Sequence, residues 1–130
     1  MALIGASPVT TLTVDLDALR NARGMVRLCL TAAADNFPTC VDDDRAVARS
    51  VPATQSSLSY DGLPPGGYAL AVIHDENGNG KLDTFMGIPR EGFGFSRNPR
   101  IAFGPPSFKS ARFTLSDLGD EQRIRMRYMF

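Results

Sequence analysis

Polar and apolar residues alternate along several stretches of this chain. In residues 11–19, leucine and valine at every second position would share one face of an extended segment, with threonine and aspartate on the other. Successive side chains of a strand point to opposite faces, so this period of two predicts a half-buried β-strand. Residues 25–31 repeat the pattern, and the Asn-Ala-Arg-Gly turn between the two stretches predicts a β-hairpin.

Further strands are predicted over residues 46–51, 56–60, 68–74, 111–115 and 123–130. The third of these is nearly continuous in apolar character, which is typical of a central strand covered on both faces. Proline and glycine in residues 61–67 predict a tight turn before it. We find no clear amphipathic helix in the sequence. The predicted fold class is therefore all-β, an antiparallel β-sandwich of about seven strands.

Length and charge restrict the classes of function. The chain has 130 residues, of which 43% are hydrophobic, so we expect a single domain over residues 1–130. Its 14 lysines and arginines balance 14 acidic residues, so no long-range field favours nucleic acid or an anionic membrane. No apolar run has the length of a transmembrane segment, and residues 1–7 are too short for a complete signal peptide.

Residues 75–109 show little regular pattern. A structureless loop of that length in a compact domain is functional or tied down internally. Its phenylalanines are Phe93, Phe95, Phe103 and Phe108. They either pack into the core or form an exposed aromatic surface that binds a glycan or a peptide beside arginines. The candidate ligand-binding residues of that second interpretation are Arg90, Phe93, Phe95, Arg97 and Arg100.

Residues 74–83, His-Asp-Glu-Asn-Gly-Asn-Gly-Lys-Leu-Asp, place oxygen-bearing side chains at every second position. An EF-hand loop takes calcium ligands from positions one, three and five, then a glycine and a backbone carbonyl, and counting from Asp75 reproduces that order. The match fails at position twelve, where Met86 replaces a bidentate glutamate. The predicted Ca²⁺ ligands are Asp75, Asn77, Asn79, the Lys81 carbonyl and Asp83, with Glu91 available to complete the shell. The alternative is a plain Asn-Gly turn held by its own hydrogen bonds.

The two cysteines predict a disulfide. Cys29 ends a strand-like run and Cys40 follows a Phe-Pro turn, so the intervening loop is easily closed. In an oxidising compartment such a bond contributes on the order of 2–3 kcal/mol in chain-entropy models. The alternative is a pair of buried thiols in a cytosolic protein. A structural zinc site is poorly supported, because the chain offers only His74 besides the two cysteines and four ligands are needed.

His74 is the one histidine of the chain, and it stands at the end of the apolar strand over residues 68–74. An enzyme could use it as a base, with Asp75, Glu76 or Glu91 as the partner carboxylate. A lone histidine at the end of a buried strand is more often structural. We therefore rank catalysis behind binding and structural roles, and predict no catalytic residues.

Four segments together carry a resemblance to a known family: residues 63–68, 74–83, 87–96 and 104–108. They resemble the bacterial family called domain of unknown function 2141, and the likeness runs from about residue 12 to residue 128. The resemblance implies an exported protein, periplasmic or secreted, with an immunoglobulin-like or transthyretin-like sandwich. It brings no established activity, and it implies that the signal peptide is absent from this chain.

Three functions from different classes follow. The first expectation is a non-catalytic, calcium-stabilised module of the bacterial cell envelope, monomeric, with an unknown protein or glycan partner. The second is a glycan- or peptide-binding module that uses the Phe/Arg loop. The third is an enzyme that uses His74 and a neighbouring carboxylate.

Overall fold

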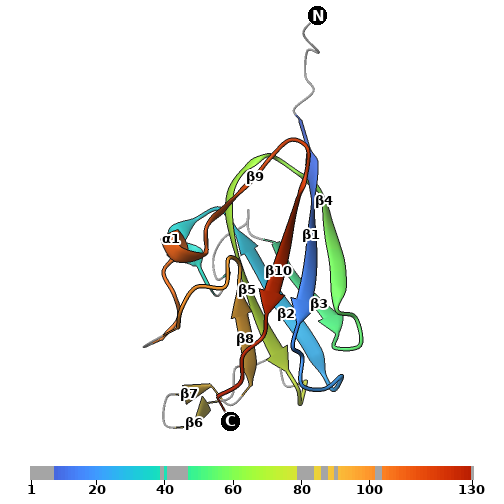
Figure 1. Ribbon diagram of the computed structural model, residues 1–130, viewed down its shortest axis with the longest axis vertical. Coiled ribbons are helices and arrows are strands. Elements are labelled where there is room, and N and C mark those ends of the chain that lie inside the picture. Colours follow the sequence, from blue (N-terminus) through green and yellow to red (C-terminus); the bar gives the residue numbers. More distant parts are fainter. Residues whose placement is uncertain are drawn as a thin grey trace, which may run out of the picture.

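The structure is a computed structural model that describes residues 8–38, 40, 47–78, 84–85, 88–89, 91–101 and 104–129. Two β-sheets lie one over the other (Figure 1). Sheet A has the strand order β10 (Asp120–Arg125), β1 (Thr10–Asp17), β4 (Ser57–Leu63). Sheet B has the order β3 (Val47–Pro52), β2 (Met25–Thr31), β5 (Gly66–Asp75), β8 (Gly92–Phe95), and β9 (Phe113–Leu115) pairs with the first residues of β5.

Short elements complete the described chain. They are the 3₁₀ turn η1 (Ala34–Asn36), the two-stranded ladder of β6 (Thr84–Phe85) and β7 (Ile88–Pro89), and the single-turn helix α1 (Phe108–Ala111). In Figure 1, η1 (cyan) lies beside α1 (orange) at one side of sheet B. The all-β sandwich prediction is confirmed, with three strands in sheet A and five in sheet B rather than about seven in all.

The hairpin prediction is wrong, because the first two strands lie in different sheets. β1 pairs with β4 and, in parallel, with β10, whereas β2 pairs with β3 and β5. Residues 18–24 carry the chain from sheet A to sheet B. Alternation shows which side chains point inward, but it is the same for two paired strands and for two strands that face each other across a sandwich.

Two strand boundaries differ from the prediction at the C-terminal end. Residue 111 belongs to α1 rather than to a strand, because Ser107 caps that turn by accepting a hydrogen bond from the Ser110 N–H (3.2 Å). β10 begins at Asp120 and ends at Arg125. Beyond it, Arg127 forms a single antiparallel bridge with Phe93, so the C-terminal segment crosses from sheet A to the edge of sheet B.

The long loop predicted over residues 75–109 contains a strand of sheet B. β8 reads Gly-Phe-Gly-Phe, and it pairs with β5 so that Phe93 lies opposite Ile73 and Gly94 opposite Val72. The alternation is therefore present, with glycine on the inner face. A Cβ atom at Gly92 would lie 2.3 Å from the Tyr128 ring, and one at Gly94 would lie 2.6 Å from Ile124 Cγ2. Glycine lets the C-terminal segment pack directly on β8.

Apolar side chains between the two sheets form the larger of two clusters, which we name the inner core. It contains Leu12, Val14, Leu16, Val26, Leu28, Leu30, Val51, Ala53, Leu58, Tyr60, Leu63, Leu70, Val72, Phe113, Leu115, Ile124 and Met126. Seven strands contribute to it, and neighbouring strands in each sheet are joined by backbone ladders. Burial of each large aliphatic side chain contributes about 1.5–3 kcal/mol relative to exposure.

A second cluster, the outer cluster, lies on the opposite face of sheet B. Its buried members are Cys29, Ala69, Ala71, Phe93, Phe95 and Ala111, and the partly buried Phe37, Cys40, Ile101 and Phe108 pack against them. Segments outside the sheets cover this face: the loop after β2 and the segment that leads into α1. Sheet B thus has both faces covered, as the apolar run of β5 predicts.

Candidate functional site

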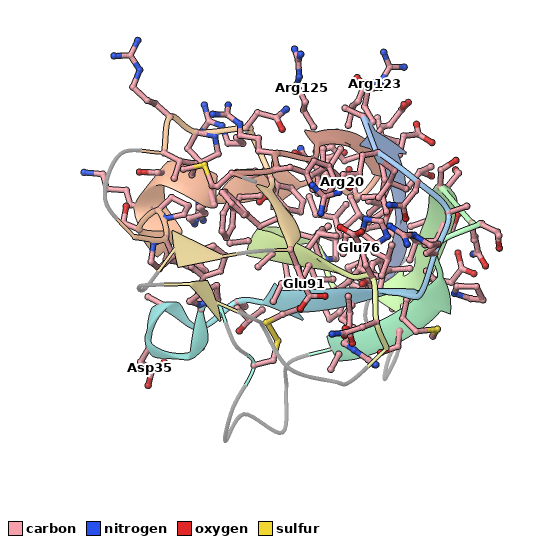
Figure 2. All side chains as sticks on the ribbon, turned by 90° about the horizontal axis from the view of Figure 1, so that it is seen from below. Arg20, Asp35, Glu76, Glu91, Arg123 and Arg125 are labelled. Carbon is pink, nitrogen blue, oxygen red and sulfur yellow. A yellow bond between two sulfur atoms is a disulfide. The ribbon has the colours of Figure 1, made fainter. Side chains whose placement is uncertain are left out.

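The end of sheet B at which β5 stops brings together His74, Asp75, Glu76 and Glu91, and we call it the base. β5 delivers His74 to the inner face and Asp75 to the outer face, because successive side chains of a strand alternate. Glu76 then begins the turn that follows. The loop between β1 and β2 reaches the same place, and Figure 2 shows its Arg20 against Glu76, with Glu91 nearby.

His74 is completely buried, and both of its ring nitrogens have protein partners. Nε2 lies 2.8 Å from the Arg23 carbonyl oxygen, and Nδ1 lies 2.8 Å from the Tyr128 hydroxyl. A carbonyl can only accept, so Nε2 carries the proton. A neutral ring then accepts at Nδ1 from the Tyr128 O–H, whose oxygen accepts the Arg20 N–H at 3.1 Å. The imidazole therefore ties together the loop after β1, the end of β5 and the C-terminal segment.

Glu76 is the centre of an ionic cluster. Its carboxylate accepts hydrogen bonds from Arg20 Nε (2.8 Å) and Asn21 Nδ2 (3.0 Å), and Arg23 Nη2 lies 3.4 Å away. Burial acts to raise the pKa of Glu76, but the hydrogen bonds from Asn21 and Arg20 and the charge of Arg20 outweigh it and hold the pKa below its usual value. The Arg20 guanidinium also lies over the Tyr128 ring, 4.4 Å from its centroid.

Asp75 and Glu91 fix the turn after β5. Asp75 is completely buried, and its Oδ2 accepts a hydrogen bond from Arg27 Nε at 2.8 Å. Glu91 is 5% exposed, and its Oε2 accepts the Glu76 backbone N–H at 2.9 Å. The Gly78 N–H donates to the Asp75 carbonyl at 3.2 Å, which closes the turn. These carboxylates thus have structural partners at the base.

The predicted calcium ligands are only partly within the described chain. Asp75, Asn77 and Glu91 are described, whereas Asn79, Lys81 and Asp83 lie outside the described residues. Asp75 and Glu91 each already use one carboxylate oxygen in a hydrogen bond. Within the described residues, no group of three or more histidine, cysteine, aspartate and glutamate side chains is placed to hold a metal ion. A calcium ion at Asp75 would share that carboxylate with the Arg27 guanidinium.

The two phenylalanines among the candidate ligand-binding residues are buried. Phe93 and Phe95 are 7% and 8% exposed and belong to the outer cluster, which agrees with their interpretation as core residues. Arg97 and Arg100 are exposed, and the Arg97 backbone N–H donates to Gln122 at 3.2 Å. Arg90 and Phe103 lie outside the described residues.

The predicted disulfide is confirmed. Cys29 of β2 is bonded to Cys40, with the two Cα atoms 5.6 Å apart. Neither cysteine is therefore a free thiol or a zinc ligand. The bond attaches the loop after β2 to the outer face of sheet B.

Five described residues of the base are absent from the sequence-based site predictions. They are Arg20, Asn21, Arg23, Arg27 and Tyr128. Arg27 carried a weak signal, because it is the one charged residue within β2. Tyr128 lies within the predicted strand over residues 123–130, but the alternation there did not indicate His74 as its partner. The others lie in the loop after β1, where no periodic pattern indicates a partner.

One bacterial protein family matches most of the chain. A family model described as an uncharacterized protein conserved in bacteria (DUF2141) matches residues 14–123. The chain belongs to this family. The matched span of the DUF2141 chain runs from β1 into β10 and includes the base apart from Tyr128. No curated protein and no solved structure matches it. Among the described residues of this DUF2141 chain, no helix has the length and apolar character that a bilayer-spanning helix needs.

Proposed function

We propose that this DUF2141 chain is a non-catalytic module of the bacterial cell envelope, periplasmic or secreted, in which residues 74–77 hold the loops at one end of the sandwich together. The burial of His74 with both ring nitrogens bonded inside the protein carries this proposal. A general base must come within hydrogen-bond distance of a substrate proton. The side chain best suited to that task is committed to Tyr128 and to Arg23.

The carboxylates of the same segment support a structural role. Asp75 pairs with Arg27 of the neighbouring strand, and Glu76 pairs with Arg20 of the loop after β1. Glu91 completes the turn by accepting the Glu76 N–H. Each of these bonds joins segments that are distant in the sequence. Breaking such a buried or partly buried pair leaves a charge without its partner, which destabilises the fold.

Export is supported by the Cys29–Cys40 bond. Disulfides persist in the periplasm and outside the cell, whereas cytosolic thiols are kept reduced. A direct test of this part is the thiol state of the protein in a bacterial host. When it is directed to the periplasm, we expect no free thiol on alkylation without reduction.

We further propose that a calcium ion binds at the base and stabilises the fold. Asp75 and Glu91 would supply carboxylate oxygens, and the remaining ligands would be Asn77, Asn79, the Lys81 carbonyl and Asp83. Because Arg27 competes for Asp75, we expect an affinity in the range of extracellular modules, about 10⁻⁴–10⁻³ M.

A double-mutant cycle between His74 and Tyr128 tests the structural role. His74→Gln and Tyr128→Phe should each lower the free energy of unfolding, and the two losses should be non-additive by about 0.5–3 kcal/mol. Tyr68→Phe is the matched control, because it removes a tyrosine hydroxyl whose hydrogen bond to Pro64 is exposed. Replacing a catalytic residue commonly leaves stability unchanged or raises it. A His74→Gln protein as stable as the wild type would therefore contradict the proposal.

A further inference from the structure

We propose that the Cys29–Cys40 disulfide is a redox-operated latch. It holds residues 32–38 and 40, which we call the cover, over the outer cluster, and its reduction by a dithiol releases the cover and exposes Phe95 and Phe108. This inference is independent of the proposed function of the base.

Among its described residues, the cover packs on the outer cluster through Cys40 and through one aromatic ring, that of Phe37. Phe37 lies 5.9 Å from Phe95 and 6.0 Å from Phe108, measured between ring centroids, and the second contact is edge-to-face. Below these rings the sheet offers small side chains, Ala69 and Ala71 of β5 and Cys29 of β2. The rings of Phe95 and Phe108 therefore pack over small side chains of the sheet, and Phe37 of the cover packs on these two rings. Figure 1 shows the cover next to α1, away from sheet A.

Other attachments of the cover are local. Among its described residues, the Phe37 N–H donates to Ala34 within the cover (3.4 Å), and the Ala33 N–H donates to the Thr31 hydroxyl next to it (3.0 Å). The first bond stays within the cover, and the second reaches only the last residue of β2, from which the cover continues. Further along the described cover, the disulfide and the packing of Phe37 hold it onto sheet B.

Sheet B itself does not depend on the latch. β2 forms ladders with both β3 and β5, and the inner core contains neither cysteine. Native proteins undergo local transitions in which a segment with few contacts opens while the β-ladders stay intact. We therefore expect the reduced protein to keep its sandwich.

The exchange chemistry begins at Cys40. Its residue is partly exposed, whereas Cys29 is 7% exposed, so a thiolate of an external dithiol reaches the Cys40 sulfur first. The new bond forms between the reductant and Cys40, and Cys29 leaves as a thiolate and takes up a proton. The second thiol of the reductant then closes its own disulfide and releases Cys40 as a thiol. The protein gains two electrons and two protons, and the dithiol becomes a disulfide.

Dye binding and circular dichroism on the full chain test the latch. We expect complete reduction with dithiothreitol to raise the fluorescence of 8-anilinonaphthalene-1-sulfonate several-fold, while the far-ultraviolet spectrum stays that of the oxidised protein. Cys40→Ser should show the raised dye signal without dithiol and should not respond to it. Alkylation and intact mass would establish that reduction is complete.

Two results would overturn the proposal. If the fully reduced wild type binds no more dye than the oxidised protein, the cover stays closed without the bond. If reduction abolishes the β-sheet signal cooperatively, the disulfide holds the whole fold rather than a cover. Both readouts come from the wild-type chain, so they decide the matter even where Cys40→Ser fails to fold.

Discussion

The two faces of sheet B are covered in different ways. On the inner face, β5 presents Leu70 and Val72 to sheet A, which brings its own backbone ladders to the contact. On the outer face, β5 presents Ala69 and Ala71 to segments attached by a disulfide and aromatic packing. β8 reverses this distribution, with glycine inside and phenylalanine outside. The inner face of sheet B is therefore covered by another hydrogen-bonded sheet, whereas the segments that cover its outer face are held by a disulfide and by aromatic packing.

The largest effect should come from the inner face. Leu70→Ala leaves a cavity at a completely buried position, and we expect it to lower the free energy of unfolding by about 2–5 kcal/mol. Phe37→Ala on the cover should lower it by only about 1–2 kcal/mol, because the ring is partly exposed and less apolar area returns to water. Urea unfolding of both variants measures the difference. Equal losses would show that the outer face matters as much to global stability as the inner core.

Overpacking of β8 tests how closely the C-terminal segment approaches. Gly94→Ala would place a Cβ atom 2.6 Å from Ile124 Cγ2 and 3.2 Å from the Arg125 carbonyl oxygen, so we expect a loss of about 1–3 kcal/mol. Gly104→Ser is a useful contrast, because its Cβ atom would meet no atom of the described residues within 4 Å, and the expected cost comes from its positive φ of 74°. Thermal denaturation distinguishes them. A Gly94→Ala protein with wild-type stability would mean that β8 and β10 are further apart.

The acid sensitivity of the base should depend on Glu76. Its folded-state pKa is depressed, so its stabilising effect is complete above its ordinary value of 4.5 and is lost as the pH falls through the folded-state pKa. The melting temperature of the wild type should therefore exceed that of Glu76→Gln near neutral pH, and the gap should narrow in acid. Glu121→Gln is the control, because the hydrogen bond and charge of Asp15 raise the pKa of Glu121. The difference in melting temperature between the wild type and this variant should therefore have the opposite sign. If the difference in melting temperature between the wild type and Glu76→Gln stays constant down to about pH 3, the ionic cluster does not stabilise the fold through the charge of Glu76.

Calcium should produce the smallest change. At an affinity near 10⁻³ M, millimolar calcium adds about 0.4 kcal/mol, which is a rise of roughly one or two degrees in melting temperature. Arg27→Gln removes the guanidinium that shares Asp75, so it should tighten calcium binding several-fold, whereas Asp75→Asn should abolish it. Titration calorimetry measures both. No heat of binding in any of the three proteins, with identical melting curves in chelator, would mean that the turn is held by hydrogen bonds alone.

Much of the sandwich can be predicted from the sequence, but its pairing cannot. Period-two alternation correctly marked the strand that begins at Thr10 and the strand that begins at Met25, because burial on one face fixes that pattern. It could not show that these strands face each other rather than pair. β8 was missed because its inner-face residues are glycines. Glycine is needed there because Ile124 and Tyr128, which are distant in the sequence, approach the strand closely.

The base was only partly predictable. The motif at residues 74–83 indicated that the end of β5 matters, and the spacing of Cys29 and Cys40 indicated their bond. The arginines that neutralise Asp75 and Glu76 come from a strand and a loop more than 45 residues earlier in the chain, at sequence separations of 48 and 56. Such partners are set by sheet register and loop path, which a linear pattern does not encode.

The state of the His74 ring shows whether the motif side chains at the base are structural. The chain contains one histidine, so a long-range proton–nitrogen correlation spectrum reports on that ring alone. We expect a single Nε2–H tautomer whose proton exchanges slowly with water, because the completely buried ring donates it to the Arg23 carbonyl. A ring with averaged nitrogen shifts and a rapidly exchanging proton would place His74 in contact with solvent and contradict that structural role.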